Sequence, residues 1–337
     1  MYEFIEIVDE KRRRFSLALP TERGAYAESI ATFARRDNNL HQNANTAVLI
    51  MDHLRGRGTL IDVGSSIGLV SLPVAVSGSN VVAVELLPEN CFYQHLSIIE
   101  NRLGNLRLFQ AAAGAQRGLV GFAGTEAWGH VAPLGTGPAA PMLRLDDIVQ
   151  LVNRQTRRFV RRPLLIKVDT EGYELPVLRG ATAAIAAYDP VFLVECIVVE
   201  GREEPSDLHA RAVKEFLEES GYHLYLQHGS RLAPRTAADI QEGHVCDFLA
   251  TRRRYRPGDR IGRFEIGDLS FDQSLAWIGE MTGFELPPHR LHAVGVIARW
   301  IAEGRRDPAM LDLGRRLCRD TDDGVARAAT RLLPALR

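Results

Sequence analysis

Cysteine is scarce in this sequence, and its four residues are widely separated. Cys91, Cys196, Cys246 and Cys318 form no CxxC pair, the spacing typical of zinc sites and thiol–disulfide motifs. The sequence therefore argues against a zinc centre or a disulfide framework. Because reduced thiols are normal in the cytoplasm, we expect a cytoplasmic protein.

Long apolar runs are also missing. No stretch approaches the roughly 18 consecutive apolar residues that a membrane-spanning helix needs, so we expect no membrane span. The first 15 residues alternate polar and apolar side chains. A secretory signal would instead place an apolar block behind a basic start.

An excess of charge of either sign is absent. The 41 basic and 42 acidic residues give a formal net charge of −1. A non-specific nucleic-acid binder carries a clear basic excess, so we expect no nucleic-acid partner. Only three of the basic residues are lysines, which we interpret as a composition bias toward arginine. Hydrophobic residues make up 46% of the chain, a content that excludes dominant disorder.

Apolar segments alternate with helix-like segments between residues 44 and 251. Strands are expected at 59–63, 80–85, 106–112, 164–169, 191–195, 222–227 and 245–251, and helices at 44–55, 69–76, 89–101, 146–154, 174–187 and 209–220. This alternation predicts an α/β fold with a doubly wound, mostly parallel sheet and helices on both faces. In such sheets ligands bind beyond the carboxyl ends of the strands.

Composition and pattern divide the chain into three regions. Strands at 2–8 and 12–19 open the first, while 114–142 is expected to form loops with short strands and 252–263 a linker. The regions are an N-terminal strand and helix extension at 1–40, the alternating segment at 41–253 and an appendage of two to four helices at 254–337.

The sharpest local motif is LIDVGSSIG, from Leu60 to Gly68. An acidic residue closes a strand there, and Gly64 lets the backbone turn sharply and approach a ligand. Glu85 ends the next strand, 21 residues after Gly64. That is close to the spacing of an acid that binds a ribose diol.

The motif favours a nucleoside without phosphates. A dinucleotide fingerprint has glycine where Ser66 stands, so that the backbone can reach a pyrophosphate. S-adenosylmethionine suits the sequence better, and a strand–turn–helix without ligand is the alternative. The expected cofactor-binding residues are Asp62, Gly64, Ser65, Ser66, Gly68, Glu85, Leu86 and Ala112.

A second motif, LIKVDTEGYELPVLRG, spans residues 165–180. Here the chain resembles the FkbM family of S-adenosylmethionine-dependent methyltransferases, which has a strand of the form IKIDVEG followed by E-x-x-VL-x-G. The segments IDVGSSIG, VVAVELLPEN, LRLDDI and VFLVEC agree as well, so the resemblance covers about residues 41–251. It implies a Rossmann-like class I methyltransferase fold and O-methylation of a hydroxyl, foremost that of a sugar in a glycan, glycolipid or secondary metabolite.

The sequence departs from the family pattern in two places. The family has Ala-Asn where Ser65 and Ser66 stand. It also often has an acid after the glycine that follows the third strand, where this chain has Ala115. We therefore expect backbone groups near Ala112 to contact the adenine.

Methyl transfer to a hydroxyl also requires removal of its proton, by a base or with a metal. Asp169, Glu171 and Glu195 lie at or just beyond the ends of two expected strands, so they are expected to converge and supply that base. Glu171 has a helix-capping alternative, and Glu195 could instead be a solvated acid that ends its strand. The three carboxylates could also hold Mg²⁺, but no motif demands a metal and none is assigned.

Two further side chains are candidates for catalysis. Lys167 shares a strand face with Asp169, where it is expected to pair with Asp169 or lower the pKa of the acceptor. The alternative is a plain buried ion pair with an acid such as Asp146. His130 follows the third strand and is a candidate base, with a solvated loop histidine as its alternative.

Other interpretations remain open. The arginine-rich run at 154–162 fits a solvated helix face, or a docking site for an anionic acceptor. The whole chain could be a nicotinamide-dependent oxidoreductase. It could also be a catalytically silent module that docks a biosynthetic partner, or a second copy, through 254–337.

Overall fold

The computed structural model describes residues 1–9, 11–22, 24–37, 44–125, 129–196, 206–228, 231–235, 246–268, 270–282, 287–332 and 334. Two strands and two helices come first: β1 (Tyr2–Val8), β2 (Arg14–Pro20), α1 (Ala25–Asp37) and α2 (Ala44–Leu54). Strands and helices then alternate as β3 (Thr59–Val63), α3 (Ser71–Val76), β4 (Asn80–Glu85), α4 (Pro88–Glu100) and β5 (Leu106–Gln110). Apart from α1, for which no bounds were predicted, these elements agree with the predicted ones to within about two residues.

The second half of the alternating segment follows after a group of short strands. Its elements are α5 (Leu145–Gln155), β10 (Leu164–Val168), α6 (Glu174–Arg179), α7 (Thr182–Tyr188), β11 (Val191–Cys196), α8 (Ser206–Glu219), β12 (His223–His228), β13 (Arg231–Arg235) and β14 (Cys246–Thr251).

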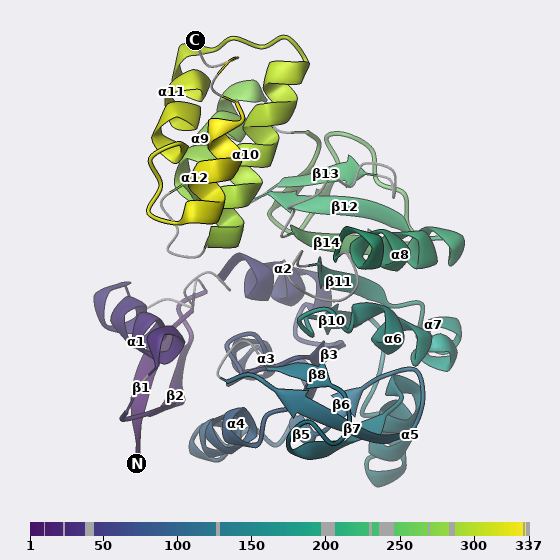
Figure 1. Ribbon diagram of the computed structural model, residues 1–337. Helices are drawn as coiled ribbons and strands as arrows, with labels where there is room; N and C mark the ends of the chain where they lie inside the picture. The colour runs from purple at the N-terminus through teal and green to yellow at the C-terminus, as the bar shows by residue number, and fades with distance from the viewer. Residues whose placement is uncertain are drawn as a thin grey trace.

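One large sheet organises the molecule (Figure 1). Besides the strands already named it contains β15 (Arg260–Ile261) and β16 (Phe264–Ile266). Its strand order is β15-β16-β13-β12-β14-β11-β10-β3-β4-β5. The five strands from β11 to β5 are parallel to one another, and β14 is antiparallel to β11. The predicted doubly wound, mostly parallel sheet is confirmed, and it brings the carboxyl ends of five strands to one edge.

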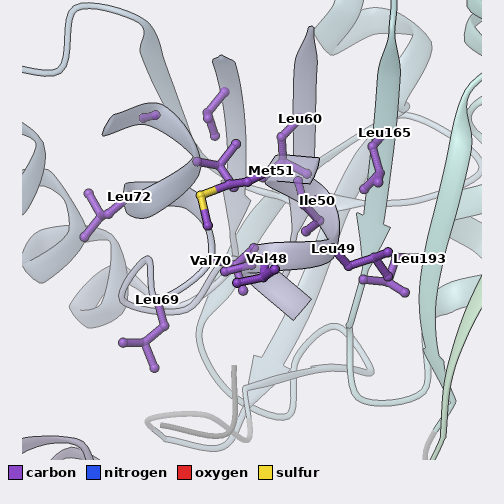
Figure 2. Packing of buried hydrophobic residues seen from close by; sticks show 14 of the residues in the cluster. Val48, Leu49, Ile50, Met51, Leu60, Leu69, Val70, Leu72, Leu165 and Leu193 are labelled. Carbon is purple, nitrogen blue, oxygen red and sulfur yellow. The ribbon is translucent and has the colours of Figure 1, made fainter. Parts of the chain in front are cut away.

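Alternate residues of each strand supply two separate cores. Leu60, Leu165 and Leu193 face α2, α3 and the N-terminal hairpin, as Figure 2 shows for α2 and its neighbours. Ile61 and Ile166 face the opposite way, toward α5, α6, α7 and α8. Both faces are therefore covered, which explains why the strands are continuous apolar runs rather than alternating ones.

The N-terminal hairpin is fastened to α4 through the free edge of β2. Ala18 donates its backbone N–H to Ser97 Oγ, and Asn101 exchanges two hydrogen bonds with the backbone of Ser16. Two side chains thus satisfy backbone groups that an edge strand leaves unpaired. This anchoring holds an isolated two-stranded hairpin, which by itself is marginally stable.

The predicted strand at 106–112 is interrupted. The strand of the main sheet ends at Gln110, and Ala112 belongs to a second sheet with the order β6-β9-β7-β8. Because the Gly- and Pro-rich segment at 114–142 pairs with itself, its short strands form a sheet that local pattern did not predict. The strands are β6 (Ala112–Ala113), β7 (Gly118–Ala123), β8 (His130–Ala132) and β9 (Ala139–Leu143).

The predicted helix at 174–187 is two helices that meet at Gly180. A Cβ on Gly180 would overlap the backbone oxygen of Gly114, so the chain needs glycine at this contact. Asp146 then accepts the backbone N–H groups of Ala183 and Ala184 at the start of α7. A side chain distant in sequence provides this cap, so the break could not be predicted from the helix pattern.

The prediction of a linker at 252–263 is wrong in part. Residues within and after it form β15 (Arg260–Ile261) and β16 (Phe264–Ile266), and β16 pairs with β13. Phe264 and Ile266 are fully buried. Their alternating pattern was present in the sequence, but the many arginines around it obscured the strand.

The C-terminal helices form a unit with a core of its own. Asp307 and Asp322 cap two of these helices, and a buried ion pair joins Arg290 to Asp320 at 2.9 Å. We propose that this unit begins at Phe271 rather than at residue 254. Its helices are α9 (Phe271–Met281), α10 (Pro287–Ala302), α11 (Pro308–Leu317) and α12 (Asp323–Thr330). Across the described part of the chain, no helix combines the length and apolarity needed to cross a membrane.

Candidate active site

Strand register brings the predicted catalytic side chains to one face of the sheet. Lys167 lies directly opposite Asp62 on β3 and opposite Leu193 on β11. Two residues further along, Asp169 and Glu195 therefore face each other across β10 and β11, on the same face as Lys167. Asp62, Lys167, Asp169 and Glu195 form the group that we call the acidic cluster.

Lys167 is the charged centre of the acidic cluster. Its Nζ donates to Asp169 Oδ2 at 2.7 Å and lies 3.9 Å from Asp62 Oδ1. Burial disfavours an ammonium, but the charges of Asp169 and Asp62 outweigh it and raise the pKa of Lys167. The expected pairing with Asp169 is confirmed. The alternative partner, Asp146, caps α7 instead.

Asp62 lies beneath the site and is fully buried. Its Oδ2 accepts from Ser71 Oγ at 2.6 Å, whereas Oδ1 has no hydrogen-bond partner within the described residues. Burial raises the pKa of Asp62, while Lys167 and Ser71 act to lower it. The Asp62 carboxylate thus provides a second negative charge beside the Lys167 ammonium.

Asp169 and Glu195 form a carboxyl pair. A hydrogen bond joins the two carboxyl groups, and two carboxyl groups can form one only if either carries the proton. Burial and the charge of Asp169 raise the pKa of Glu195 well above its usual value. Burial also acts on Asp169, but the Lys167 ammonium and the hydrogen bond from Glu195 lower its pKa. Asp169 is therefore the ionised member and Glu195 the protonated one.

A further acid of the site, Asp247, was not found from the sequence. It lies opposite Glu195 in the antiparallel pair of β11 and β14, so its side chain is on the same face as that of Glu195. Burial, helped by the charge of Asp169, raises the pKa of Asp247 to about 6. The only available signal was an acid at the start of the last predicted strand, which does not reveal its neighbour.

Asp247 should make the stability of the protein depend on pH. Its pKa in the folded state is above the usual value, so its protonated form contributes stability at low pH that is lost as the pH rises through about 6. In Asp247→Asn the side chain stays neutral. Between pH 4 and pH 7, we expect the free energy of unfolding of the wild type to fall by about 1–3 kcal/mol relative to that of Asp247→Asn. Urea unfolding at both pH values measures this, and a constant difference would contradict it.

Glu171 joins Asp169 and Glu195 at the mouth of the site. One carboxylate oxygen from each of the three lies within 4.8 Å of the others. Glu171 has a φ of 56°, an uncommon conformation for a residue other than glycine. Capping was the predicted alternative for Glu171. In the structure Glu174 has this role, because it accepts the backbone N–H groups of Thr170 and Gly172.

A pocket lies beside the acidic cluster, at the carboxyl ends of β3 and β4. It encloses about 370 Å³, including the part open to solvent. Asp169 lies at one side of it, and apolar groups from the second sheet form another. The lining residues are Val63, Gly64, Val84, Glu85, Leu86, Ala111, Ala112, Ala113, Gly129, Val131, Asp169, Thr170 and Tyr173.

Glu85 is held in place by the turn that the first motif predicted. Its carboxylate accepts the backbone N–H groups of Ser66 and Leu87, both at 2.7 Å. Burial raises the pKa of Glu85, and these hydrogen bonds act in the opposite direction. Such backbone donors orient the carboxylate toward the pocket that it lines.

The predicted cofactor residues thus fall into two groups. Gly64, Glu85, Leu86 and Ala112 line the pocket, and a Cβ on Gly64 would overlap the backbone oxygen of Asp169. Asp62, Ser65, Ser66 and Gly68 are not part of the pocket lining, as far as the described residues show. They form the turn behind it, where Ser65 Oγ donates to Gln94 and Ser66 adopts a φ of 49°. The turn was evident from the sequence, but which of its atoms reach the pocket was not.

The other candidates have clear positions. His130 is half-buried on β8. Its neighbours Gly129 and Val131 line the pocket, but His130 is not among the lining residues. The arginine-rich run at 154–162 leads into the amino end of β10. It therefore lies at the opposite edge of the sheet from the carboxylates.

Comparison with known proteins gives one family match. The model of the methyltransferase FkbM domain matches residues 62–224. No protein of curated function matches the chain. Among solved structures, methyltransferase FkbM from Methylobacillus flagellatus KT is 20% identical with a TM-score of 0.38, over 58% of this chain and 44% of that one. The match therefore spans less than half of the length of that protein.

Two further solved structures match more of their own length. An O-methyltransferase from Bacillus cereus in complex with SAH is 12% identical with a TM-score of 0.40, over 69% of this chain and 93% of that one. Cofactor-bound Rv0187 from MTB is 12% identical with a TM-score of 0.38, over 70% and 93%.

Proposed function

We propose that this chain, a member of the FkbM methyltransferase family through residues 62–224, is an O-methyltransferase. Its acceptor would be a hydroxyl, foremost that of a sugar in a glycan, glycolipid or secondary metabolite. The proposal includes both S-adenosylmethionine-dependent methyl transfer, which the family match supports, and the choice of oxygen as the acceptor atom. One observation carries it: Asp169 lines the pocket, and the buried Lys167 ammonium donates to its Oδ2 at 2.7 Å.

The residues around the pocket fit S-adenosylmethionine. Glu85 presents an oriented carboxylate, which suits the two hydroxyls of a ribose. Ala111, Ala112 and Ala113 offer a small, apolar wall for an adenine ring. No phosphate-binding lysine or arginine lines the pocket among the described residues, as expected for this cofactor and not for a nicotinamide dinucleotide. The bound cofactor supplies the methyl group.

The acidic cluster fits the task of accepting a proton from the acceptor hydroxyl. Asp169 is the member of the cluster that lines the pocket, and Lys167 keeps it ionised. An ionised carboxylate beside the pocket can accept a hydrogen bond from the hydroxyl, orient its oxygen and take its proton as the new bond forms. Glu195 holds Asp169 from the other side, so the base is fixed in one orientation.

A metal-assisted route is the second candidate mechanism. Asp169, Glu171 and Glu195 offer three carboxylate oxygens within 4.8 Å of one another, which suits a hard divalent cation such as Mg²⁺. Such an ion would lower the pKa of a hydroxyl bound to it. The buried Lys167 ammonium beside the same carboxylates already neutralises one negative charge, and this favours the metal-free route.

Binding of the cofactor can be tested with a single variant. We expect Glu85→Gln to bind S-adenosylhomocysteine about 10–100-fold more weakly in calorimetric titration, because hydrogen bonds to a charged group contribute about 1.5–3 kcal/mol. Glu89→Gln, an exposed acid in the first turn of α4, is the matched control and should bind as the wild type does. Equal affinities of all three proteins would contradict the role of Glu85.

Transfer to oxygen needs a chemical assay. The purified protein is incubated with S-adenosylmethionine carrying a labelled methyl group and with free, nucleotide-linked and lipid-linked sugars, with and without EDTA. An O-methyl sugar in the product supports the proposal, and its loss with EDTA supports the metal-assisted route. Label found on nitrogen or carbon would overturn transfer to oxygen. A cytoplasmic location and a partner for residues 254–337 stay predictions.

A further inference from the structure

A second hollow lies at the edge of the sheet opposite the acidic cluster. β12 begins there at His223, while β13 and β14 end there at Arg235 and Thr251. The hollow encloses about 1140 Å³, including its open mouth. Residues that line it include Tyr225, Pro234, Arg235, Arg254, Tyr255 and Arg256. It is remote from methyl transfer, so the chemistry of that reaction does not explain it.

The arginines around this hollow differ in how far their charge is neutralised. Arg254 and Arg256 are exposed, and neither guanidinium forms an ion pair with a described residue. Arg253 lies over the ring of Tyr255 at 4.7 Å. This stacking uses the face of the guanidinium and leaves its N–H donors at the edge available. Arg235 is different, because Asp268 neutralises it at 2.7 Å.

The aromatic wall of the hollow is rigid. Tyr225 Oη accepts the backbone N–H of Tyr255 at 2.7 Å, and the two rings meet edge to face at 5.9 Å. Tyr225 is fully buried, whereas Tyr255 is half-buried and offers ring surface beside the arginines. The segment RRRYRP at 252–257, predicted to be a linker, is therefore fixed against the sheet, and its arginines are exposed.

We propose that this hollow binds a phosphate-bearing ligand whose ring packs on Tyr255. Planar guanidinium groups pair with phosphate oxygens through two parallel hydrogen bonds. Arg254 and Arg256 supply two such groups in the lining, and Arg253 supplies a third beside it, stacked on the ring of Tyr255. Two acids lie nearby: Glu218 lines the hollow, and Asp259 accepts the backbone N–H of Arg256 at 2.8 Å. The three arginines outnumber them, so the charge favours an anion. A nucleotide and a sugar phosphate share this chemistry, with a base or a pyranose as the ring.

The test compares two triple variants of the full chain. Arg253→Ala, Arg254→Ala and Arg256→Ala together remove the two lining guanidinium groups that form no ion pair with a described residue, and the adjacent one stacked on Tyr255. Arg154→Ala, Arg157→Ala and Arg161→Ala remove the same charge from the arginine-rich run at the same edge. Each protein is titrated with uridine 5′-diphosphate, glucose 1-phosphate and inorganic pyrophosphate at low ionic strength. Titration with S-adenosylhomocysteine shows that each variant is folded.

We expect the wild type to bind uridine 5′-diphosphate or glucose 1-phosphate about 10-fold more tightly than pyrophosphate, because the ring adds stacking. The tighter of the two identifies the ring as a base or a sugar. The first triple variant should lose about 100-fold in affinity or more, and the second less than about 3-fold. Absence of binding by the wild type would overturn the proposal, as would equal losses in the two variants or preference for pyrophosphate.

Discussion

Replacing Asp169 by asparagine is expected to lower kcat about 10²–10⁴-fold, the usual contribution of a general base. Asparagine preserves the shape of the side chain but cannot take the proton of an acceptor hydroxyl. The cofactor contacts at Glu85 are unchanged, so S-adenosylhomocysteine should bind nearly as tightly as in the wild type. Measuring kcat together with the cofactor affinity separates loss of catalysis from loss of the fold.

Asp189→Asn is the matched control for this experiment. Asp189 is half exposed at the opposite edge of the sheet, and its φ of 50° is a conformation that asparagine adopts readily. Its kcat should equal that of the wild type. Unchanged kcat in Asp169→Asn would remove Asp169 from the reaction. A loss that occurs only in the presence of added Mg²⁺ would point to the metal-assisted route.

Replacing Lys167 by methionine is expected to destabilise the protein by about 3–5 kcal/mol, the usual cost of leaving a buried charge without its partner. Lys167 is 7% exposed and stands between Asp62 and Asp169. Without the ammonium, the fully buried Asp62 must take up a proton or remain charged and unpaired. Urea unfolding at pH 7 measures the loss.

Two variants make this result interpretable. Lys11→Met removes another lysine from an ion pair, but Lys11 is 36% exposed, so its loss should cost less than about 1 kcal/mol. The double variant Lys167→Met, Asp62→Asn should recover part of the lost stability, because the buried acid is neutral from the start. If Lys167→Met unfolds at the same urea concentration as the wild type, the balance of charges proposed for the acidic cluster is wrong.

The acidic cluster shows where prediction from sequence succeeds. Lys167, Asp169 and Glu195 were identified because acids at the ends of parallel strands meet at one edge, and Lys167 was placed on the face of Asp169 by the two-residue repeat of a strand. Asp247 was missed because antiparallel register joins it to Glu195 across a long stretch of chain. No local pattern contains that pairing.

The pocket shows the same division. Its position, its turn and its acid Glu85 followed from LIDVGSSIG and from spacing alone. Which atoms point inward depends on contacts between distant segments. Asp62 belongs to the turn motif, yet Ser71 and Lys167 hold it beneath the site.

The sequence by itself determined the alternating strands and helices, the parallel sheet, the cofactor turn and the group of strand-end acids. These follow from local periodicity, glycine geometry and residue spacing, which act over short stretches of chain. Only the tertiary structure decided that Gly180 divides a helix and that residues 114–142 form a second sheet. It also decided that Asp169 and Glu195 face each other as a carboxyl pair and that residues 254–257 wall a basic hollow. Each of these depends on burial and on contacts between residues far apart in the chain, and those contacts exist only when the sheet is assembled.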